Sequence, residues 1–196
     1  MPATYDEVAA HYDAAIRPLE RWFLKRLRQR AFENLPQTGR LLEIGAGTGL
    51  NFAFYPLQAE GMATDLSSEM LKLAAAKPRP EAISLVQTRA EQLPFQADSF
   101  DAAVATLVFC SIDSQAEAFD EIQRVVKPGG RLVLLDHVRP EGLLGPLFDL
   151  INVVTSRLCG DHFNRRTANM AASAGLKVLH LDKQILGIFN IIVCEV

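Results

Sequence analysis

Three glycines alternate with other residues directly after a short apolar run, in the segment LLEIGAGTGLN from Leu41 to Asn51. Glycine has no Cβ, so Gly45, Gly47 and Gly49 allow a sharp turn and a close approach of a ligand to the backbone. The residues before them are typical of a buried parallel strand, and those after them of a helix start. Because α/β folds bind nucleotide-like ligands at such crossings, the segment predicts a cofactor site.

The spacing of the glycines distinguishes two classes of cofactor. A dinucleotide fingerprint requires a glycine three positions after the second one, but Leu50 stands there and Gly49 comes one residue earlier. Glu43, two residues before the first glycine, would repel a pyrophosphate in a partly desolvated site. The loop therefore favours a cationic ligand without phosphates. Its pattern, E-x-G-x-G-x-G, resembles the first motif of the Rossmann-like S-adenosylmethionine-dependent methyltransferases.

An acidic residue, Asp65, follows the second predicted strand in the segment GMATDLSSEML. A carboxylate at this place can accept hydrogen bonds from both hydroxyls of a ribose. Asp65 could instead cap the helix predicted from Ser68. Because Ser67 or Ser68 can supply that cap, the ribose role is favoured.

Five elements follow one another in the order and spacing of one family: the glycine loop, Asp65, the A-E-x-L-P-F segment, S-F-D before a strand, and V-x-K-P-G-G-R-L. Over roughly Leu41 to Val138 the chain resembles methyltransferases of the ubiquinone and menaquinone biosynthesis type. The resemblance implies S-adenosylmethionine as cofactor, with S-adenosylhomocysteine as product. It assigns to the cofactor site Tyr12, Glu43, Gly45, Ala46, Gly47, Gly49, Asp65, Leu66, Met70, Ala90, Glu91, Thr106 and Leu107.

Within this set, the resemblance implies that Ala90 and Glu91 border the adenine and that Thr106 and Leu107 meet the methionine end of the cofactor. One position departs from the family pattern. Members often carry an aspartate before A-E, which accepts a hydrogen bond from the adenine amino group, whereas this chain has Arg89. The adenine contact is then expected from the backbone or another side chain, with weaker cofactor binding.

The stretch from Thr106 to Gly142 and the later CGDHFNRRT resemble a second branch, the membrane-associated thiol and lipid methyltransferase-like proteins of animals and their bacterial relatives. That branch acts on apolar acceptors. The apolar segment from Gly142 to Leu158 agrees with such an acceptor. It could line an acceptor pocket or pack as core, since apolar walls are typical of both.

Methyl transfer from a sulfonium depends mainly on aligning the acceptor with the methyl group. A general base is needed only where the acceptor arrives protonated. The candidates are Asp136 and His137, at the carboxyl end of the fifth predicted strand, and His162. A surface or structural role stays open for each histidine. Tyr12 is expected to close over the cofactor, and His11 beside it is a further candidate for the general base.

Short apolar runs alternate with segments of helical periodicity along the 196 residues. Strands are predicted at 40–44, 61–64, 83–87, 102–106, 131–136, 177–182 and 188–194, and helices at 51–55, 68–76, 115–126 and 167–174. This alternation predicts an α/β, Rossmann-like, doubly wound sheet of seven mostly parallel strands. We expect a single domain over 1–196, with an N-terminal helical cap at 5–33 and an acceptor-side insertion at 139–175.

The composition limits the partners of the chain. A net charge of −3 and a pI near 5.8 argue against nucleic acid. Three scattered cysteines do not suit a disulfide framework or a zinc site, so no metal is expected. The N-terminus has no signal-peptide pattern and no apolar run is long enough to span a bilayer, which predicts a cytoplasmic location.

A basic segment interrupts this acidic chain within the helix predicted from Tyr5 to Phe32. Cationic residues alternate there with apolar ones: Arg17, Leu19, Arg21, Trp22, Phe23, Lys25, Arg26, Leu27, Arg28 and Arg30. Residues 17–30 could touch an anionic membrane surface. The favoured interpretation is a solvated cationic face on a helix that packs against the sheet. The sequence contains no pattern that indicates an oligomeric state.

The sequence as a whole predicts an S-adenosylmethionine-dependent methyltransferase. Its acceptor is expected to be a small apolar molecule, such as a quinol, a thiol or a lipid-like compound, methylated by direct displacement. Two alternatives stay open. One is a nicotinamide-dependent oxidoreductase, which Leu50 and Glu43 disfavour, and the other is a protein that binds the cofactor without catalysis.

Overall fold

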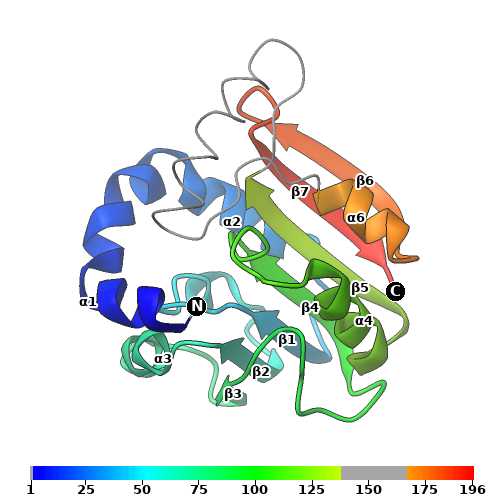
Figure 1. Cartoon of the computed structure of the whole chain (residues 1–196), viewed down its shortest axis with the longest axis horizontal. Coiled ribbons are helices and arrows are strands. Elements are labelled where there is room, and N and C mark those ends of the chain that lie inside the picture. The colour runs from blue at the N-terminus through cyan, green and yellow to red at the C-terminus, as the bar shows by residue number, and fades with distance from the viewer. Residues whose placement is uncertain (1, 138–166) are drawn as a thin grey trace.

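A computed structural model describes residues 2–137 and 167–196 of the chain. Its strands form one seven-stranded sheet in the order β3-β2-β1-β4-β5-β7-β6 (Figure 1). The strands are β1 Arg40–Ile44, β2 Glu60–Asp65, β3 Ile83–Gln87, β4 Phe100–Thr106, β5 Val126–His137, β6 Lys177–Gln184 and β7 Phe189–Glu195. Neighbouring strands from β3 to β5 pair in parallel, and β7 runs antiparallel to both β5 and β6. The predicted seven-stranded, mostly parallel α/β fold is confirmed.

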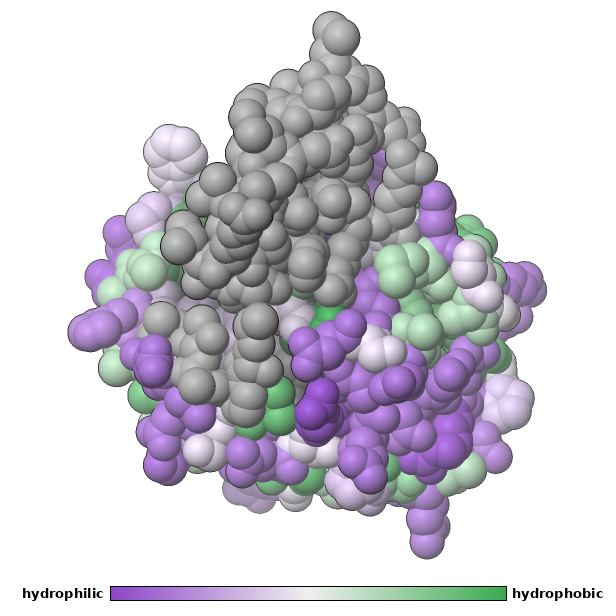
Figure 2. All heavy atoms as spheres, viewed as in Figure 1, coloured by the Kyte–Doolittle hydropathy of each residue, from purple (hydrophilic) through white to green (hydrophobic). Residues whose placement is uncertain are grey.

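Helices cover both faces of this sheet. They are α1 Pro2–Leu19, the π-helix η1 Glu20–Leu24, α2 Lys25–Phe32, the 3₁₀-helix η2 Phe52–Phe54, α3 Ser68–Ala75, α4 Gln115–Val125 and α6 Thr167–Ser173. Core residues of α2 and α3 join one apolar cluster, and those of α4 and α6 join the cluster on the opposite face. Hydrophilic side chains gather on the outer side of α4 (Figure 2). The central strands are therefore buried on both faces, which explains their nearly continuous apolar sequences.

Two predicted helices differ from the structure. The one expected from Tyr5 to Phe32 is two α-helices joined by η1, which starts two residues after Pro18; proline removes a backbone donor and so disturbs regular α-helical bonding. The one expected at 51–55 is only the short turn η2. It ends because Tyr55 is extended and packs its ring on Phe32, 5.5 Å between centroids.

Strands β1, β2, β4 and β5 end at the same edge of the sheet, since they pair in parallel and in register. The loops that follow them meet at this carboxyl edge, where sheets of this class bind ligands. Of the predicted insertion at 139–175, only the part that includes α6 is described, and the segment 142–158 and His162 lie outside the described residues. Within the described part, no helix has the length and apolarity to cross a membrane.

Candidate active site

A cavity of about 240 Å³ opens at the carboxyl edge of the sheet. Most of the predicted cofactor residues line it: Tyr12, Gly45, Ala46, Gly47, Asp65, Leu66, Met70, Ala90, Glu91, Thr106 and Leu107. They come from α1 and from the segments that follow β1, β2, β3 and β4. The structure thus brings together residues that are spread over almost half of the chain.

The three glycines of the loop after β1 serve two different purposes. All have positive φ angles, of 68°, 55° and 80° for Gly45, Gly47 and Gly49. A Cβ on Gly45 would lie 2.3 Å from Cγ2 of Val108, and one on Gly49 would lie 2.5 Å from the ring of Phe52. A Cβ on Gly47 would meet no atom within 4 Å. Gly45 and Gly49 therefore permit local packing, whereas Gly47 keeps the backbone accessible from the cavity.

Asp65 reaches the loop from the end of β2. Its Oδ2 accepts a hydrogen bond of 2.7 Å from the Gly47 N–H, and its Oδ1 accepts one of 2.9 Å from the Ser67 N–H. Burial raises the pKa of Asp65, and the backbone hydrogen bonds oppose this increase. Ser67, rather than Asp65, caps α3 by accepting from the Met70 N–H. A carboxylate can accept about four hydrogen bonds, so Asp65 keeps acceptor capacity for a ligand.

Glu43 lies below the cavity and does not line it, and the same holds for Gly49. The Glu43 side chain is fully buried and accepts hydrogen bonds from the Asn51 amide and the Tyr55 hydroxyl. Burial raises the pKa of Glu43, although both hydrogen bonds and the charge of Arg28 act in the opposite direction. Burial also raises the pKa of Tyr55, and the neighbouring Glu43 charge adds to this effect. Glu43 thus supports the glycine loop from beneath.

Arg28, at the side of the cavity, was not among the predicted site residues. Its Nη1 donates to Asn51 Oδ1 at 2.9 Å and to Thr106 Oγ1 at 2.6 Å, and its Nε donates to Glu20 Oε1 at 2.8 Å. Only 4% of Arg28 is exposed. The interpretation of Arg28 as part of a solvated or membrane-facing surface is therefore wrong. Its spacing from the buried Leu24 was the available signal, because residues four apart share a helix face.

Arg89, the departure from the family pattern, lines the far part of the same cavity. Its guanidinium lies 3.3 Å from an oxygen of Asp113 and 3.7 Å from an oxygen of Glu91. Both carboxylates belong to the cavity wall. This part of the site therefore presents acidic oxygens although the usual aspartate is replaced.

Leu107, which follows β4, has a left-handed backbone with φ 57°. A bulky residue rarely adopts this conformation, which costs about 1–3 kcal/mol where it occurs. The conformation is held by a 2.7 Å hydrogen bond from the Leu107 N–H to the Leu135 carbonyl. Backbone strain of this kind concentrates at functional sites, and here it coincides with the cavity wall.

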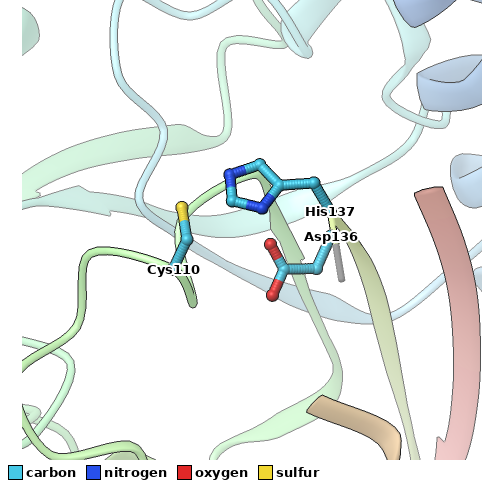
Figure 3. Close-up of side chains that lie close together, drawn as sticks. All are labelled: Cys110, Asp136 and His137. Atoms are coloured by element: carbon cyan, nitrogen blue, oxygen red, sulfur yellow. The ribbon is translucent and has the colours of Figure 1, made fainter. Parts of the chain in front are cut away.

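The side chains of Cys110, Asp136 and His137 point toward one another beside the cavity (Figure 3). One ligand-type atom from each lies within 4.8 Å of the others. Thr167 donates a hydrogen bond of 2.8 Å to Asp136 Oδ2. The cluster offers groups that accept protons or bind a metal ion. None of the three residues lines the cavity, but the cluster adjoins it because Cys110 lies in the loop after β4 between Val108 and Ser111, which do line it.

The chain is similar to known methyltransferases in sequence. A family model described as a methyltransferase domain matches residues 42–134. A demethylmenaquinone methyltransferase of Renibacterium salmoninarum is 31% identical over 176 residues, which cover 87% of this chain and 71% of that protein. The chain belongs to the class I S-adenosylmethionine-dependent methyltransferase family. A nicotinamide-dependent oxidoreductase receives no support from these comparisons.

Two further relatives of this chain differ in the acceptor that their names indicate. The ubiquinone/menaquinone biosynthesis C-methyltransferase UbiE of Syntrophotalea carbinolica is 36% identical over 69% of this chain and 60% of its own length. The thiol S-methyltransferase TMT1B of Rattus norvegicus is 33% identical over 74% of this chain and 62% of its own length. The chain thus spans about three fifths of these two relatives.

A solved structure shares the fold over its whole length. It is a SAM-dependent methyltransferase from Thermotoga maritima, with a TM-score of 0.76 and 23% identity, and the match covers 100% of this chain and 99% of that one. The likeness confirms the fold.

Proposed function

We propose that this methyltransferase binds S-adenosylmethionine in the cavity and transfers its methyl group to a small apolar acceptor. The observation that carries the proposal is the ligand-accessible backbone at Gly47, with Arg28 and Asp65 beside it in one cavity. An anion-binding group, a carboxylate and an open backbone are the functions that an amino-acid end and a ribose require.

The donors of Arg28 fit the amino-acid end of the cofactor. Its Nε and Nη1 are used by Glu20, Asn51 and Thr106. Among the described residues, Nη2 has no partner, so two N–H groups stay available to a carboxylate in the cavity. Asp65 would hold the ribose, and the segment at Ala90 and Glu91 would border the adenine. Arg28 bonds Thr106 at the end of β4, Asp65 ends β2 and Ala90 follows β3, so the strand order β4-β1-β2-β3 supports this arrangement of the cofactor.

When bound, S-adenosylmethionine supplies an electrophilic methyl group on a sulfonium, and it leaves as the neutral thioether S-adenosylhomocysteine. The residues of this chain orient the reactants and limit their motion, which accounts for most of the rate in such a reaction. His137 and Asp136 are the proposed proton acceptors for an acceptor molecule that arrives protonated. His137 is 8% exposed and Asp136 1%, so His137 is the more accessible of the two.

Binding and turnover test the proposal separately. Isothermal titration with S-adenosylmethionine should show saturable binding, while NADH should show none. Absence of binding at millimolar S-adenosylmethionine would overturn the cofactor assignment. A panel of quinols, alkyl and aryl thiols and phospholipids, assayed for S-adenosylhomocysteine, should then identify the acceptor class.

The relatives support two members of that panel in particular, since their names indicate quinone precursors and thiols. A His137→Gln variant is the matched control for acceptor chemistry. It should retain cofactor binding and lose turnover mainly with acceptors that carry an ionisable proton. Cofactor binding without turnover of any acceptor would instead favour a binding protein, an alternative that Arg89 at the usual aspartate position supports.

A further inference from the structure

The exposed surface of η1, and of the helical turns on either side of it, has an unusual composition. Trp22 is 88% exposed and Leu19 is 47% exposed. Four exposed cations lie close to them in the sequence: Arg17, Arg21, Lys25 and Arg26. We call these six residues the basic face. An aromatic side chain this exposed gains nothing from the core of the protein, so its position requires another explanation.

The cations of the basic face differ from the other basic residues of the same helical segment in their ion pairing among the described residues. Across residues 2–137 and 167–196, none of the four forms an ion pair, whereas Arg28 and Arg30 of the same helical segment do. The segment from Arg17 to Arg30 carries six basic residues and one acidic residue, a net charge of +5, although the whole chain carries −3. Positive charge is thus concentrated where the apolar side chains are exposed.

A second group of exposed apolar side chains lies at the same edge of the molecule. The turn between β6 and β7 exposes 82% of Leu186 and 42% of Ile185. The ring of Phe23, next to Trp22, lies 5.2 Å from the ring of Phe189, just after this turn. Figure 1 shows the end of α1 and this turn at the same upper end of the molecule.

The backbone of this turn adopts a conformation that is unusual for bulky residues. Ile185 and Leu186 have φ angles of 50° and 57°, a region that Asn and Gly occupy at the lowest cost. Two bulky apolar residues therefore stand, strained and exposed, where polar turn residues would fit better. Because β5 and β7 pair His137 with Phe189, the turn also lies at the carboxyl edge that holds the cavity.

We propose that the basic face and the turn at Ile185 and Leu186 dock the protein on an anionic lipid bilayer. Tryptophan favours the boundary between headgroups and acyl chains, and arginine and lysine favour anionic headgroups. Nucleic acid would use the cations but not Leu19, Ile185 and Leu186. Since the surface shares its edge with the cavity, docking turns the active site toward the bilayer, where apolar acceptors dissolve. The binding itself does not depend on the proposed methyl transfer.

Trp22 is the one tryptophan of the chain, so its fluorescence reports directly on this surface. Vesicles of phosphatidylcholine with about 30% phosphatidylserine should shift its emission to the blue, and brominated lipids should quench it. Pure phosphatidylcholine vesicles should produce a much weaker effect, and about 0.5 M NaCl should reverse most of the binding. No shift and no co-sedimentation with anionic vesicles would overturn the proposal.

Variants identify the residues responsible. The triple change Arg21→Gln, Lys25→Gln and Arg26→Gln should weaken binding about 100-fold, since each cation near an anionic surface contributes roughly fivefold. Trp22→Ala, followed by co-sedimentation, should also weaken it. Leu57→Ala is the matched control, because Leu57 is 97% exposed but precedes β2, at the opposite edge of the sheet. It should bind as the wild type does.

Two other outcomes would also contradict the proposal. Equal binding of the triple variant and the wild type would show that charge does not direct the interaction. A dimer in the absence of vesicles that dissociates on Trp22→Ala would identify the surface as a contact between copies of the chain. The vesicle assays contain no cofactor, so their result is separate from the test of S-adenosylmethionine binding.

Discussion

Arg28 and Arg26 lie two residues apart on one helix and occupy opposite environments. Arg28 is buried and bonded to Glu20, Asn51 and Thr106, while Arg26 is exposed and has no ion-pair partner among the described residues. A buried guanidinium needs several acceptors to offset its desolvation, and an exposed one needs none. The same residue type therefore supports a binding site on one side of the helix and a surface for other molecules on the other.

The contrast extends to the groups around each arginine. Arg28 belongs to a buried polar network with Glu43, Asn51, Tyr55 and Thr106, in which most side chains have more than one partner. Removing a member of such a network leaves other polar groups buried without partners. The cations of the basic face lack this coupling. Mutations in the two regions should therefore change the free energy of unfolding by different amounts, and even in opposite directions.

Arg28→Met should produce the largest effect, a loss of about 3–5 kcal/mol in the free energy of unfolding. It leaves Glu20 Oε1 and Asn51 Oδ1 without the donor they have in the wild type, and Thr106 with one donor fewer. It should also weaken S-adenosylmethionine binding. Arg26→Met is the matched control and should change stability by less than about 0.5 kcal/mol. Urea unfolding and calorimetric titration measure both quantities. Equal destabilisation by the two variants would remove the distinction drawn between the two arginines.

Thr106→Val should lower the free energy of unfolding by a smaller amount, about 1–3 kcal/mol, because the Thr106 hydroxyl accepts hydrogen bonds from both Arg28 and Asn51. Valine has nearly the same shape, so packing is preserved and the hydrogen bonds alone are tested. Urea unfolding should show an unchanged m-value with a lower midpoint. An unchanged midpoint would mean that the network does not depend on this hydroxyl.

Glu43→Gln should change the pH dependence of stability. Because burial raises the pKa of Glu43 above its ordinary value of 4.5, the folded state holds this proton more tightly than the unfolded state does. The stability due to Glu43 is therefore fully present below pH 4.5 and is lost as the pH rises through the raised pKa. The advantage of the wild type over Glu43→Gln in urea unfolding should shrink from pH 4 to pH 7.

Asp101 provides a control of opposite sign for this pH series. A hydrogen bond from Lys127, together with one from the Arg40 N–H, lowers the pKa of Asp101. The stability due to the ionised Asp101 carboxylate is present above its ordinary pKa of 3.8 and is lost as the pH falls through the lowered pKa. The advantage of the wild type over Asp101→Asn should therefore grow with pH, and two parallel trends would contradict both assignments.

Arg21→Gln should have the smallest effect, and it should be stabilising. Arg21 lies four residues from both Arg17 and Lys25, and like charges at this spacing on a helix cost about 0.2–0.5 kcal/mol. The gain should appear in thermal unfolding at low ionic strength and vanish in about 0.5 M NaCl. A loss of stability on this substitution would show that Arg21 has a partner after all.

The fold and part of the site could be predicted from local patterns. The bounds of β1 and β3 match the prediction, and the other strands differ by a few residues at their ends, because buried parallel strands form short apolar runs between turn signals. The helix cap at Ser67 follows from its hydroxyl group and its position. The turn η2 was predicted as a longer helix, because the extended conformation of Tyr55 depends on its contacts with Phe32 and Glu43.

The sequence by itself determined the glycine loop, Asp65 and the positions of the strands along the chain, since each of these depends on residues near one another in the chain. Only the tertiary structure decided that Arg28 turns inward, that Cys110 lies beside Asp136 and His137, and that Glu43 stays beneath the cavity. These outcomes depend on contacts between segments far apart in the chain. Burial and hydrogen-bond partners assign their roles to these side chains, and neither can be known before the segments are packed together.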